Sequence, residues 1–185
     1  MNDKNAICIL IPVHNGIAYT KKALVQINNS LNKIKSRNYK FYIIIIDDGS
    51  TDGTSEWIKT NYKNIHLIHG DGNRWWSGSI NMGIKYAINK FGPDYFLLLN
   101  NDLIIAKNYF DKLSELIKQY YDSDNKIIIV SKVFYLNYPV KVFSMGALFN
   151  RYTGYSRVLN YKYISKFNFH MPIEVDWAGG MGVLL

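Results

Sequence analysis

Residues 41–46 of this 185-residue chain, Phe-Tyr-Ile-Ile-Ile-Ile, limit the fold more than any other segment. Side chains alternate between the two faces of a β-strand, and this run places large apolar groups on both faces. A strand that is buried on both faces is typical of a parallel sheet covered by helices above and below. We therefore expect an α/β fold with a mostly parallel central sheet flanked by helices.

Strands and helices alternate over the first 130 residues, as such a fold requires. Short apolar runs predict strands at 6–13, 41–46, 65–69, 95–99 and 126–130. Apolar residues at three- and four-residue spacing predict the helices between them. These residues are Ala23, Leu24, Ile27, Leu31 and Ile34, then Ile80, Ile84, Ala87, Ile88 and Phe91, then Phe110, Leu113, Ile117 and Tyr120. Thr51 or Asp52 is suited to cap the helix that follows the second strand.

The last third of the chain has a different pattern. Residues 132–164 are rich in Tyr, Phe and Val, and turn-forming residues at 137–139 and 152–154 predict β-hairpins. No linker or repeat interrupts the sequence, so we expect one domain over residues 1–185 with a β-rich C-terminal extension. Because Val183-Leu184-Leu185 ends the chain inside a strand-like run, we expect a truncated piece of a longer protein.

Composition narrows the class of partner. The net charge of +8, from 22 Lys and Arg against 14 Asp and Glu, favours an anionic partner. The basic residues are scattered and form no nucleic-acid-binding motif, so we expect no nucleic acid, and a phosphorylated small molecule or an anionic membrane surface remains. No apolar run reaches the roughly 18–20 residues that cross a bilayer. The single cysteine, Cys8, lies in an apolar run, which fits a core position and a reducing, cytoplasmic setting.

Polar residues gather where four of the predicted strands end. Ligands of open parallel sheets bind at the carboxyl ends of the strands, so a binding crevice is the favoured interpretation. Ordinary turn chemistry is the alternative. The four segments are Pro12-Val13-His14-Asn15-Gly16, Asp47-Asp48-Gly49-Ser50, His69-Gly70-Asp71-Gly72-Asn73 and Asn100-Asn101-Asp102.

Four residues in and beside these segments suit particular roles. Asp48 can accept a hydrogen bond from a pyrimidine N3–H or a ribose hydroxyl, or it can cap the next helix or brace its loop. Asp102 suits a Mg2+ or Mn2+ ion that takes its other ligands from a diphosphate and water, with a turn or helix-cap role as the alternative. For the adjacent Trp75 and Trp76, either one lines the crevice against a sugar or base, or both pack on a hydrophobic rim.

Motifs of several other enzyme classes are absent from the sequence. It contains no Gly-x-x-x-x-Gly-Lys-Ser/Thr loop, no His-Glu-x-x-His pair and no Gly-x-Ser-x-Gly elbow. Gly70-Asp71-Gly72 is followed by Trp75 where a dinucleotide fingerprint needs a third glycine. These absences disfavour P-loop NTPases, zinc proteases, α/β-hydrolases and dinucleotide-dependent enzymes.

The same residues carry a family likeness. The chain resembles the family 2 glycosyltransferases of the GT-A fold, and among them the rhamnosyltransferase-like members that share a Gly-Asn-x-Trp-Trp stretch. The likeness covers essentially the whole chain. Its motifs, in order, are Ile11-Pro12-Val13-His14-Asn15-Gly16, Asp47-Asp48-Gly49-Ser50-Thr51-Asp52-Gly53-Thr54, Gly72-Asn73-Arg74-Trp75-Trp76-Ser77-Gly78-Ser79-Ile80-Asn81-Met82-Gly83, Leu98-Leu99-Asn100-Asn101-Asp102 and Gly179-Gly180-Met181-Gly182.

The resemblance implies a nucleotide-diphospho-sugar transferase fold, with a donor-binding half at 1–130 and the start of an acceptor-side region at 131–185. It implies that Asp102 binds Mg2+ or Mn2+. The family often has Asp-x-Asp at this place, and Asn100 stands here instead of the first carboxylate. The residues implied to bind the donor nucleotide are Pro12, Val13, His14, Asn15, Asp48, Asn73, Trp76, Asn81 and Asn101.

The implied activity is inverting transfer of a hexosyl or rhamnosyl group from a UDP- or dTDP-linked sugar to a hydroxyl of a saccharide or lipid-linked saccharide. Such a reaction belongs to cell-surface polysaccharide synthesis. In the family, the base that takes the acceptor proton follows the Gly-Gly stretch, so we expect it beyond Leu185. A donor-binding fragment or a non-catalytic binding module is the alternative. We expect a cytoplasmic protein, and peripheral contact with the inner face of the membrane stays open.

Overall fold

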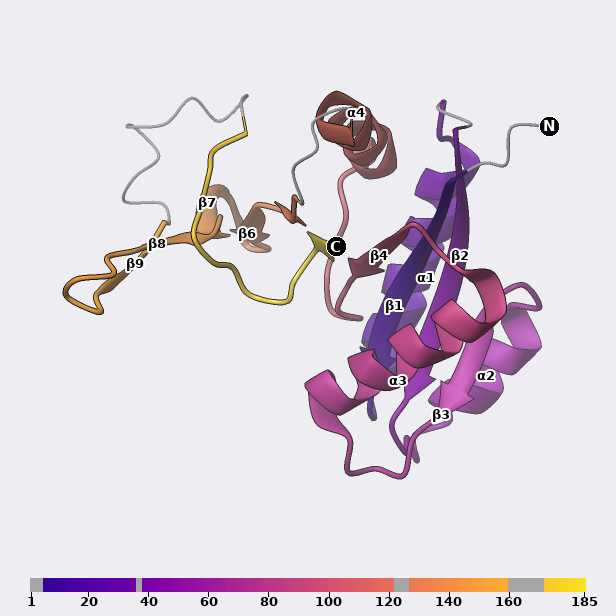
Figure 1. Cartoon of the computed structure of the whole chain (residues 1–185). Coiled ribbons are helices and arrows are strands. Elements are labelled where there is room, and N and C mark those ends of the chain that lie inside the picture. Colours follow the sequence, from indigo (N-terminus) through magenta and orange to yellow (C-terminus); the bar gives the residue numbers. More distant parts are fainter. Residues whose placement is uncertain (1–4, 36–37, 122–126, 160–171) are drawn as a thin grey trace. The chain divides into compact units, whose positions relative to one another are not determined.

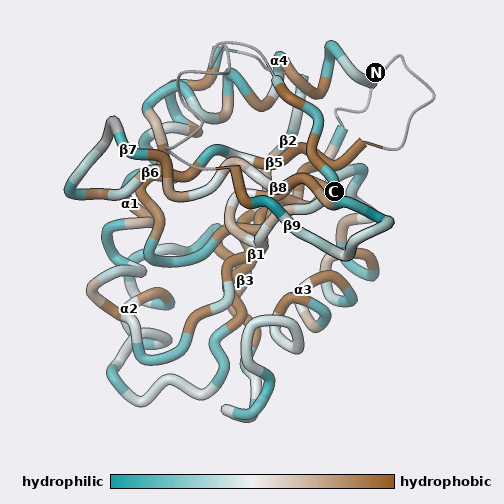
Figure 2. Tube along the Cα trace, turned by 90° about the vertical axis from the view of Figure 1, so that its left-hand side faces the viewer, coloured by the Kyte–Doolittle hydropathy of each residue, from teal (hydrophilic) through white to brown (hydrophobic). Residues whose placement is uncertain are grey.

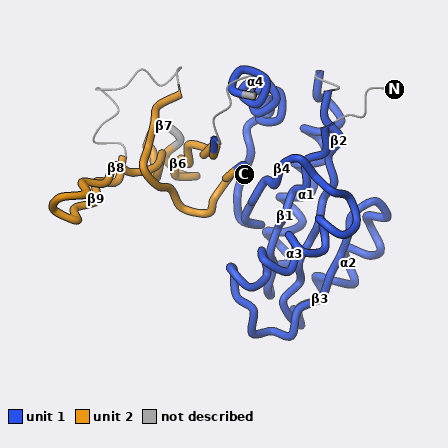
Figure 3. The backbone as a smooth tube through the Cα atoms, in the orientation of Figure 1, with its two compact units in different colours: residues 1–127, 184–185 blue, residues 128–183 orange. Residues whose placement is uncertain are grey.

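The computed structural model describes residues 5–35, 38–121, 127–159 and 172–185. The chain divides into two compact units, Met1–Ile127 with Leu184–Leu185, and Ile128–Val183 (Figure 3). We call them unit 1 and unit 2 and describe each by itself. The single domain expected from the sequence stays a prediction.

Unit 1 is built on a parallel sheet. Its strands β1 (Asn5–Val13), β2 (Tyr39–Asp47), β3 (His66–His69) and β4 (Tyr95–Leu98) lie side by side in the order β3-β2-β1-β4. Val13 pairs with Asp47, and Asp47 pairs with His69, so three of the strands end at the same level. Because β2 and β4 flank β1 on opposite sides, the strand order reverses between β1 and β4, where open sheets bind ligands.

Four helices accompany this sheet: α1 (Ile17–Asn32), α2 (Thr54–Asn61), α3 (Trp75–Phe91) and α4 (Tyr109–Tyr121). Figure 1 shows α3 in front of the sheet and α1 behind it. The helix α3 packs closely on the sheet at Gly83, which has no side chain. A Cβ at this position would lie only 2.9 Å from the Cδ1 of Ile46. The helix boundaries differ from the sequence expectation at two places. Ile34 lies beyond the end of α1, and α3 begins at Trp75, five residues before Ile80.

The two central strands, β1 and β2, form the centre of the core of unit 1, and residues of β4 and of all four helices pack into the same core. Residues 7–11 and 43–46 are buried, and the brown trace of the sheet in Figure 2 follows them. Cys8 has no exposed surface, and its burial raises the pKa of the thiol to about 11. At neutral pH the thiol therefore stays protonated, so Cys8 is a core residue and not a nucleophile.

Unit 2 contains two antiparallel hairpins. One joins β6 (Val133–Tyr135) to β7 (Tyr138–Ser144), and the other joins β8 (Ala147–Phe149) to β9 (Ser156–Val158). Val142, Met145 and Leu159 form a small core. The predicted hairpins are confirmed as far as residue 159, and positions 160–164 lie outside the described residues.

Two short strands differ from or extend the prediction. Of the strand expected at 126–130, residue 126 lies outside the described residues, and among 127–130 only β5 (Ile129–Val130) is a strand. After it, the Ser131 N–H donates to the Gly182 carbonyl. The strand-like end of the chain forms β10 (Val183–Leu184), and the next residue, Leu185, exchanges two hydrogen bonds with Phe96. Within the described ranges, no helix combines the length and the apolar character needed to span a bilayer.

Candidate functional site

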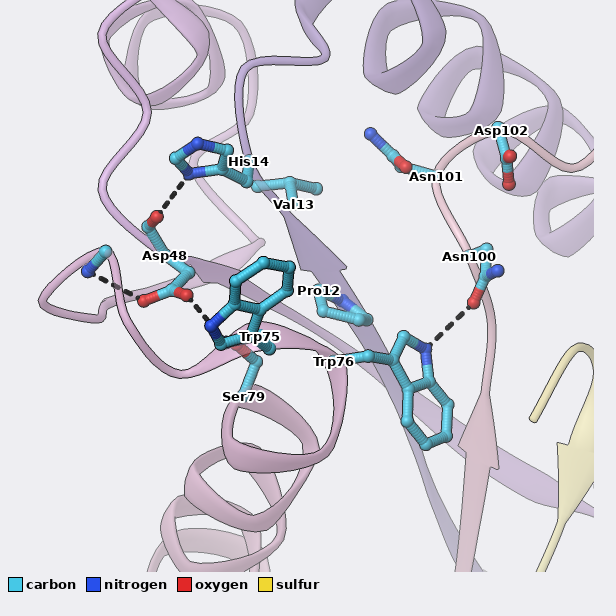
Figure 4. Close-up of a pocket in the computed structure, with 11 residues that line it drawn as sticks. Pro12, Val13, His14, Asp48, Trp75, Trp76, Ser79, Asn100, Asn101 and Asp102 are labelled. Carbon is cyan, nitrogen blue, oxygen red and sulfur yellow. Dashed lines mark hydrogen bonds between the residues drawn. The ribbon is translucent and has the colours of Figure 1, made fainter.

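The ends of the parallel strands surround a cavity of about 320 Å³ in unit 1 (Figure 4). It lies where the strand order reverses, between the ends of β1 and β4. Its size is within the usual range for small-molecule sites. The lining residues are Pro12, Val13, His14, Asp48, Gly72, Trp75, Trp76, Ser79, Asn100, Asn101 and Asp102.

Asp48 braces the loop that precedes α3. Its carboxylate is buried and accepts three backbone N–H groups, from Gly72 at 2.9 Å, Arg74 at 2.8 Å and Trp75 at 2.9 Å. The last two donors belong to the start of α3, where an N-terminus favours negative charge. Gly70 is required beside this carboxylate, because a Cβ there would collide with Asp48 Oδ1. The structure therefore shows a bracing role for Asp48, but at the loop before α3 and not at its own loop, and donor binding by Asp48 stays a prediction.

Both tryptophans line the cavity. Trp75 has φ +54°, an uncommon left-handed conformation for a bulky residue, and the Asp48 carboxylate holds its N–H. Its side chain is 82% exposed, whereas that of Trp76 is 37% exposed. The Trp76 indole N–H donates to Asn100 Oδ1 at 3.0 Å, which connects the start of α3 to the end of β4 (Figure 4). Neither ring belongs to the core.

The segment after β1 is fixed to the loop after β2. The His14 Nδ1–H donates to the Asp48 carbonyl at 2.6 Å, which leaves Nε2 to accept a hydrogen bond from Asn15 Nδ2 at 3.1 Å. Asn15 Oδ1 accepts the Thr51 N–H at 2.7 Å, so this side chain contacts the second loop and does not line the cavity. The two strand ends therefore hold each other in place.

Asp52 caps two helices at once. Its Oδ1 accepts the N–H and hydroxyl of Thr54 at the start of α2, and its Oδ2 accepts the Ile17 N–H at the start of α1. The Thr54 hydroxyl and then the Ile17 N–H lower the pKa of Asp52. The expected cap of the second helix is thus Asp52, and the same carboxylate also fixes the entry to α1.

Asn101 and Asp102 follow β4 on the other side of the cavity. Asn101 Nδ2 donates to Thr20 Oγ1 at 3.0 Å, which fixes the amide. Asp102 is exposed on the cavity wall. The described residues include no cluster of three or more His, Cys, Asp or Glu side chains that could hold a metal alone. One carboxylate with neighbouring amide oxygens fits Mg2+ or Mn2+ only where a diphosphate supplies further oxygens.

The structure gathers most of the predicted site residues. Pro12, Val13, His14, Asp48, Trp76, Asn101 and Asp102 line one cavity. Asn15 is used in loop bracing, Asn73 is exposed in the loop, and Asn81 is exposed on α3. Residues two apart on a helix do not share a face, so Asn81 lies away from the cavity residue Ser79. Lining a cavity does not test donor binding, so the donor contacts of all the predicted residues stay predictions.

Sequence reasoning missed Ser79 as a lining residue. Ser79 is fully buried, and its hydroxyl has no hydrogen-bond partner among the described residues. Helical spacing places Ser79 four residues after Trp75, on the same face of α3. That signal was hidden because the helix was expected to start only at Ile80.

Comparison with known proteins identifies relatives of one kind. A family model described as glycosyl transferase family 2 matches residues 8–177. The low-salt glycan biosynthesis hexosyltransferase of Haloferax volcanii is 34% identical over 64 residues, covering 35% of this chain and 20% of the relative. An uncharacterised glycosyltransferase of Rickettsia conorii is 30% identical over 129 residues, covering 67% of this chain and 18% of the relative. The yeast (Saccharomyces cerevisiae) dolichyl-phosphate beta-glucosyltransferase is 27% identical over 93 residues, covering 45% of this chain and 27% of the relative.

Solved structures share the fold. A mannosyltransferase of Pyrobaculum calidifontis in complex with GDP-Man and Mn2+ has a TM-score of 0.53 at 19% identity, over 72% of this chain and 37% of its own. The GalNAc-T7 structure with UDP, GalNAc and Mn2+ has a TM-score of 0.68 at 16% identity, over 100% of this chain and 36% of its own. The chain spans between 18% and 27% of the length of the three curated relatives.

Proposed function

We propose that the cavity binds a nucleoside diphosphate sugar and that the protein transfers the sugar to an acceptor hydroxyl. The premise is that the chain belongs to glycosyl transferase family 2. The observation that carries the proposal is the convergence of three strand ends and the start of α3 on one cavity of about 320 Å³. Fixed amides, an exposed carboxylate and two indole rings in one cavity suit a ligand with polar groups and a flat base.

The nucleoside is proposed to lie between the end of β1 and the Trp75 side of the cavity. A carboxylate offers about four lone-pair sites, and backbone N–H groups occupy three of those on Asp48. The fourth, on Oδ1, is available to the N3–H of a pyrimidine, which supports a UDP- or dTDP-linked donor. Asn101 is proposed to contact the ribose or the sugar.

The diphosphate is proposed to lie beside the end of β4. Asp102, with the amide oxygens next to it, would hold a Mg2+ or Mn2+ ion there, and the ion would offset charge on the leaving diphosphate. Two proteins of the same fold hold Mn2+ together with GDP-Man or UDP, which supports this choice. The Arg74 guanidinium contacts Asp71 at 3.1 Å, so we give it no role at the diphosphate.

The proposed reaction is inverting. The acceptor oxygen forms a bond to the anomeric carbon while the bond from that carbon to the diphosphate oxygen breaks, and the nucleoside diphosphate leaves. The acceptor proton goes to a general base. Within the described residues we assign no base: Asp176 of unit 2 already accepts the Phe149 N–H at 2.7 Å. A saccharide or lipid-linked saccharide acceptor in polysaccharide synthesis is the proposed context, supported by the names of the glycan-synthesising relatives.

Titration calorimetry of the chain with UDP, dTDP and GDP, with and without Mn2+, tests this proposal. We expect binding that Mn2+ strengthens and that Asp102→Asn weakens at least tenfold in the presence of the ion. Glu56→Gln, which removes another exposed carboxylate on α2, is the matched control and should leave the affinity unchanged. Binding of UDP without transfer to any acceptor would support a donor-binding module instead of an enzyme. Absence of binding by all three nucleotides contradicts the proposal.

A further inference from the structure

The β8–β9 hairpin of unit 2 (Figure 1) is joined by a turn at residues 150–155. It carries exposed aromatic, aliphatic and basic side chains. Tyr152 is fully exposed at its turn, and Tyr155 is 67% exposed beside it. We call this surface the hairpin tip. Its members are Leu148, Phe149, Arg151, Tyr152, Tyr155 and Val158, all of which are exposed.

The turn at the hairpin tip is held in shape by its backbone and by one asparagine. Asn150 Oδ1 accepts the N–H groups of Tyr152 and Thr153 at 2.9 and 3.1 Å. The Gly154 N–H donates to the Asn150 carbonyl, and the Asn150 N–H donates to the Tyr155 carbonyl, both at 2.9 Å. The tyrosine rings take no part in these hydrogen bonds, so they are free to meet a partner at little cost in ordering.

The hairpin tip belongs to a long stretch of sequence that contains basic residues and no acidic ones. From residue 125 to residue 173 the chain contains no Asp or Glu. The first acidic residues after this stretch are Glu174 and Asp176, and Asp176 accepts the Phe149 N–H beside the turn, so one carboxylate lies next to the hairpin tip. The basic residues of the stretch are Lys126, Lys132, Lys141, Arg151, Arg157, Lys162 and Lys166.

We propose that the hairpin tip docks on an anionic lipid bilayer, with the Tyr152 ring in the headgroup layer and Arg151 against lipid phosphates. Tyrosine is enriched at membrane interfaces because its ring is apolar and its hydroxyl is polar. Basic residues next to such rings are attracted to the negative surface of the cytoplasmic leaflet. A stretch of 49 residues without an acidic side chain suits an extended anionic surface. This inference does not depend on sugar transfer.

The docking site is mapped by a fluorescent label at single positions. Cys8 is the only cysteine and is fully buried, so Tyr152→Cys provides the one reactive thiol for an environment-sensitive dye. Tyr19→Cys on α1, where the native ring is 60% exposed, is the matched control. With vesicles of phosphatidylcholine containing phosphatidylglycerol we expect a blue shift at position 152 and none at position 19. Vesicles of phosphatidylcholine alone should produce no shift.

Sedimentation with the same vesicles measures the charge contribution in the unlabelled chain. Removing one basic residue at the surface, as in Arg151→Gln, should lower partitioning about fivefold. Lys22→Gln on α1, which removes an exposed charge in unit 1, should change it much less. Absence of binding to anionic vesicles overturns the proposal, as do equal shifts at positions 19 and 152. A label at 152 that responds to a saccharide or a protein but not to vesicles also overturns it.

Discussion

Replacing Asp48 by asparagine tests whether one buried carboxylate holds the loop before α3. In the structure three backbone N–H groups donate to it. An amide oxygen in the place of Oδ2 can still accept the N–H groups of Arg74 and Trp75, so the Gly72 N–H would face an NH2 group. A hydrogen bond to a charged group contributes about 1.5–3 kcal/mol. We therefore expect Asp48→Asn to lower the free energy of unfolding by about 2 kcal/mol.

Urea unfolding followed by tryptophan fluorescence measures this loss. With a dependence of about 2 kcal/mol per molar urea, the midpoint should fall by about 1 M. Asp71→Asn is the matched control in the same loop. It removes the charge of an exposed pair with Arg74, and such pairs contribute about 0–1 kcal/mol. The remaining amide oxygen can still accept the Asn73 N–H.

Hydrogen exchange separates loss of the brace from a general loss of stability. The amide protons of Gly72, Arg74 and Trp75 should exchange much faster in Asp48→Asn than in the wild type, whereas those of the β1–β2 ladder should follow global stability. The reasoning is wrong if the midpoint stays within 0.3 M, as expected for a change of about 0.5 kcal/mol, and the Gly72 amide keeps its protection.

Three further predictions concern other parts of unit 1. Because the pKa of Asp52 is lower in the folded chain than its ordinary value of about 4, its stabilisation is present above pH 4 and is lost as the pH falls through the folded pKa. Asp52→Asn should therefore show a smaller fall in Tm between pH 5 and pH 3 than the wild type, and an equal fall would contradict the double cap. Gly83→Ala should destabilise the chain by about 1–3 kcal/mol in urea unfolding, because the added Cβ meets Ile46, and an increase in stability would show that the helix shifts freely. Ser79→Ala should change the free energy of unfolding by less than about 0.5 kcal/mol, since its buried hydroxyl has no partner to lose. The same variant should weaken UDP binding about fivefold, and an unchanged affinity removes Ser79 from the binding residues.

The sheet could be predicted because its signal is strong and local. An unbroken run such as Ile43–Ile46 can only be buried on both faces, and parallel strands place their carboxyl ends together, so the position of the cavity followed as well. The lining of the cavity was harder to predict. Whether Asp48 contacts a ligand or braces a loop depends on where the backbone N–H groups of residues 72–75 lie, 24 to 27 residues later in the chain, and no pattern in the sequence specifies that.

The errors have similar physical causes. The start of α3 was missed because Trp75-Trp76-Ser77-Gly78 contains a glycine and no apolar periodicity, whereas the Asp48 carboxylate supplies the missing cap from another strand. The strand predicted at 126–130 was too long because the prediction counted apolar residues alone. The length of a strand also depends on its partner strand, which was not considered.

The hydrogen bond between Trp76 and Asn100 has an evolutionary consequence. A phenylalanine at position 76 would leave the amide oxygen at position 100 without its donor, and an apolar residue at position 100 would leave the indole N–H unpaired. Either substitution alone is therefore disfavoured, so the residues at positions 76 and 100 should covary across homologues. A lineage that has an aspartate at position 100 can keep the tryptophan, because a carboxylate accepts the same N–H. Such a lineage would have a second acidic group at this end of the sheet without disturbing the mouth of the cavity.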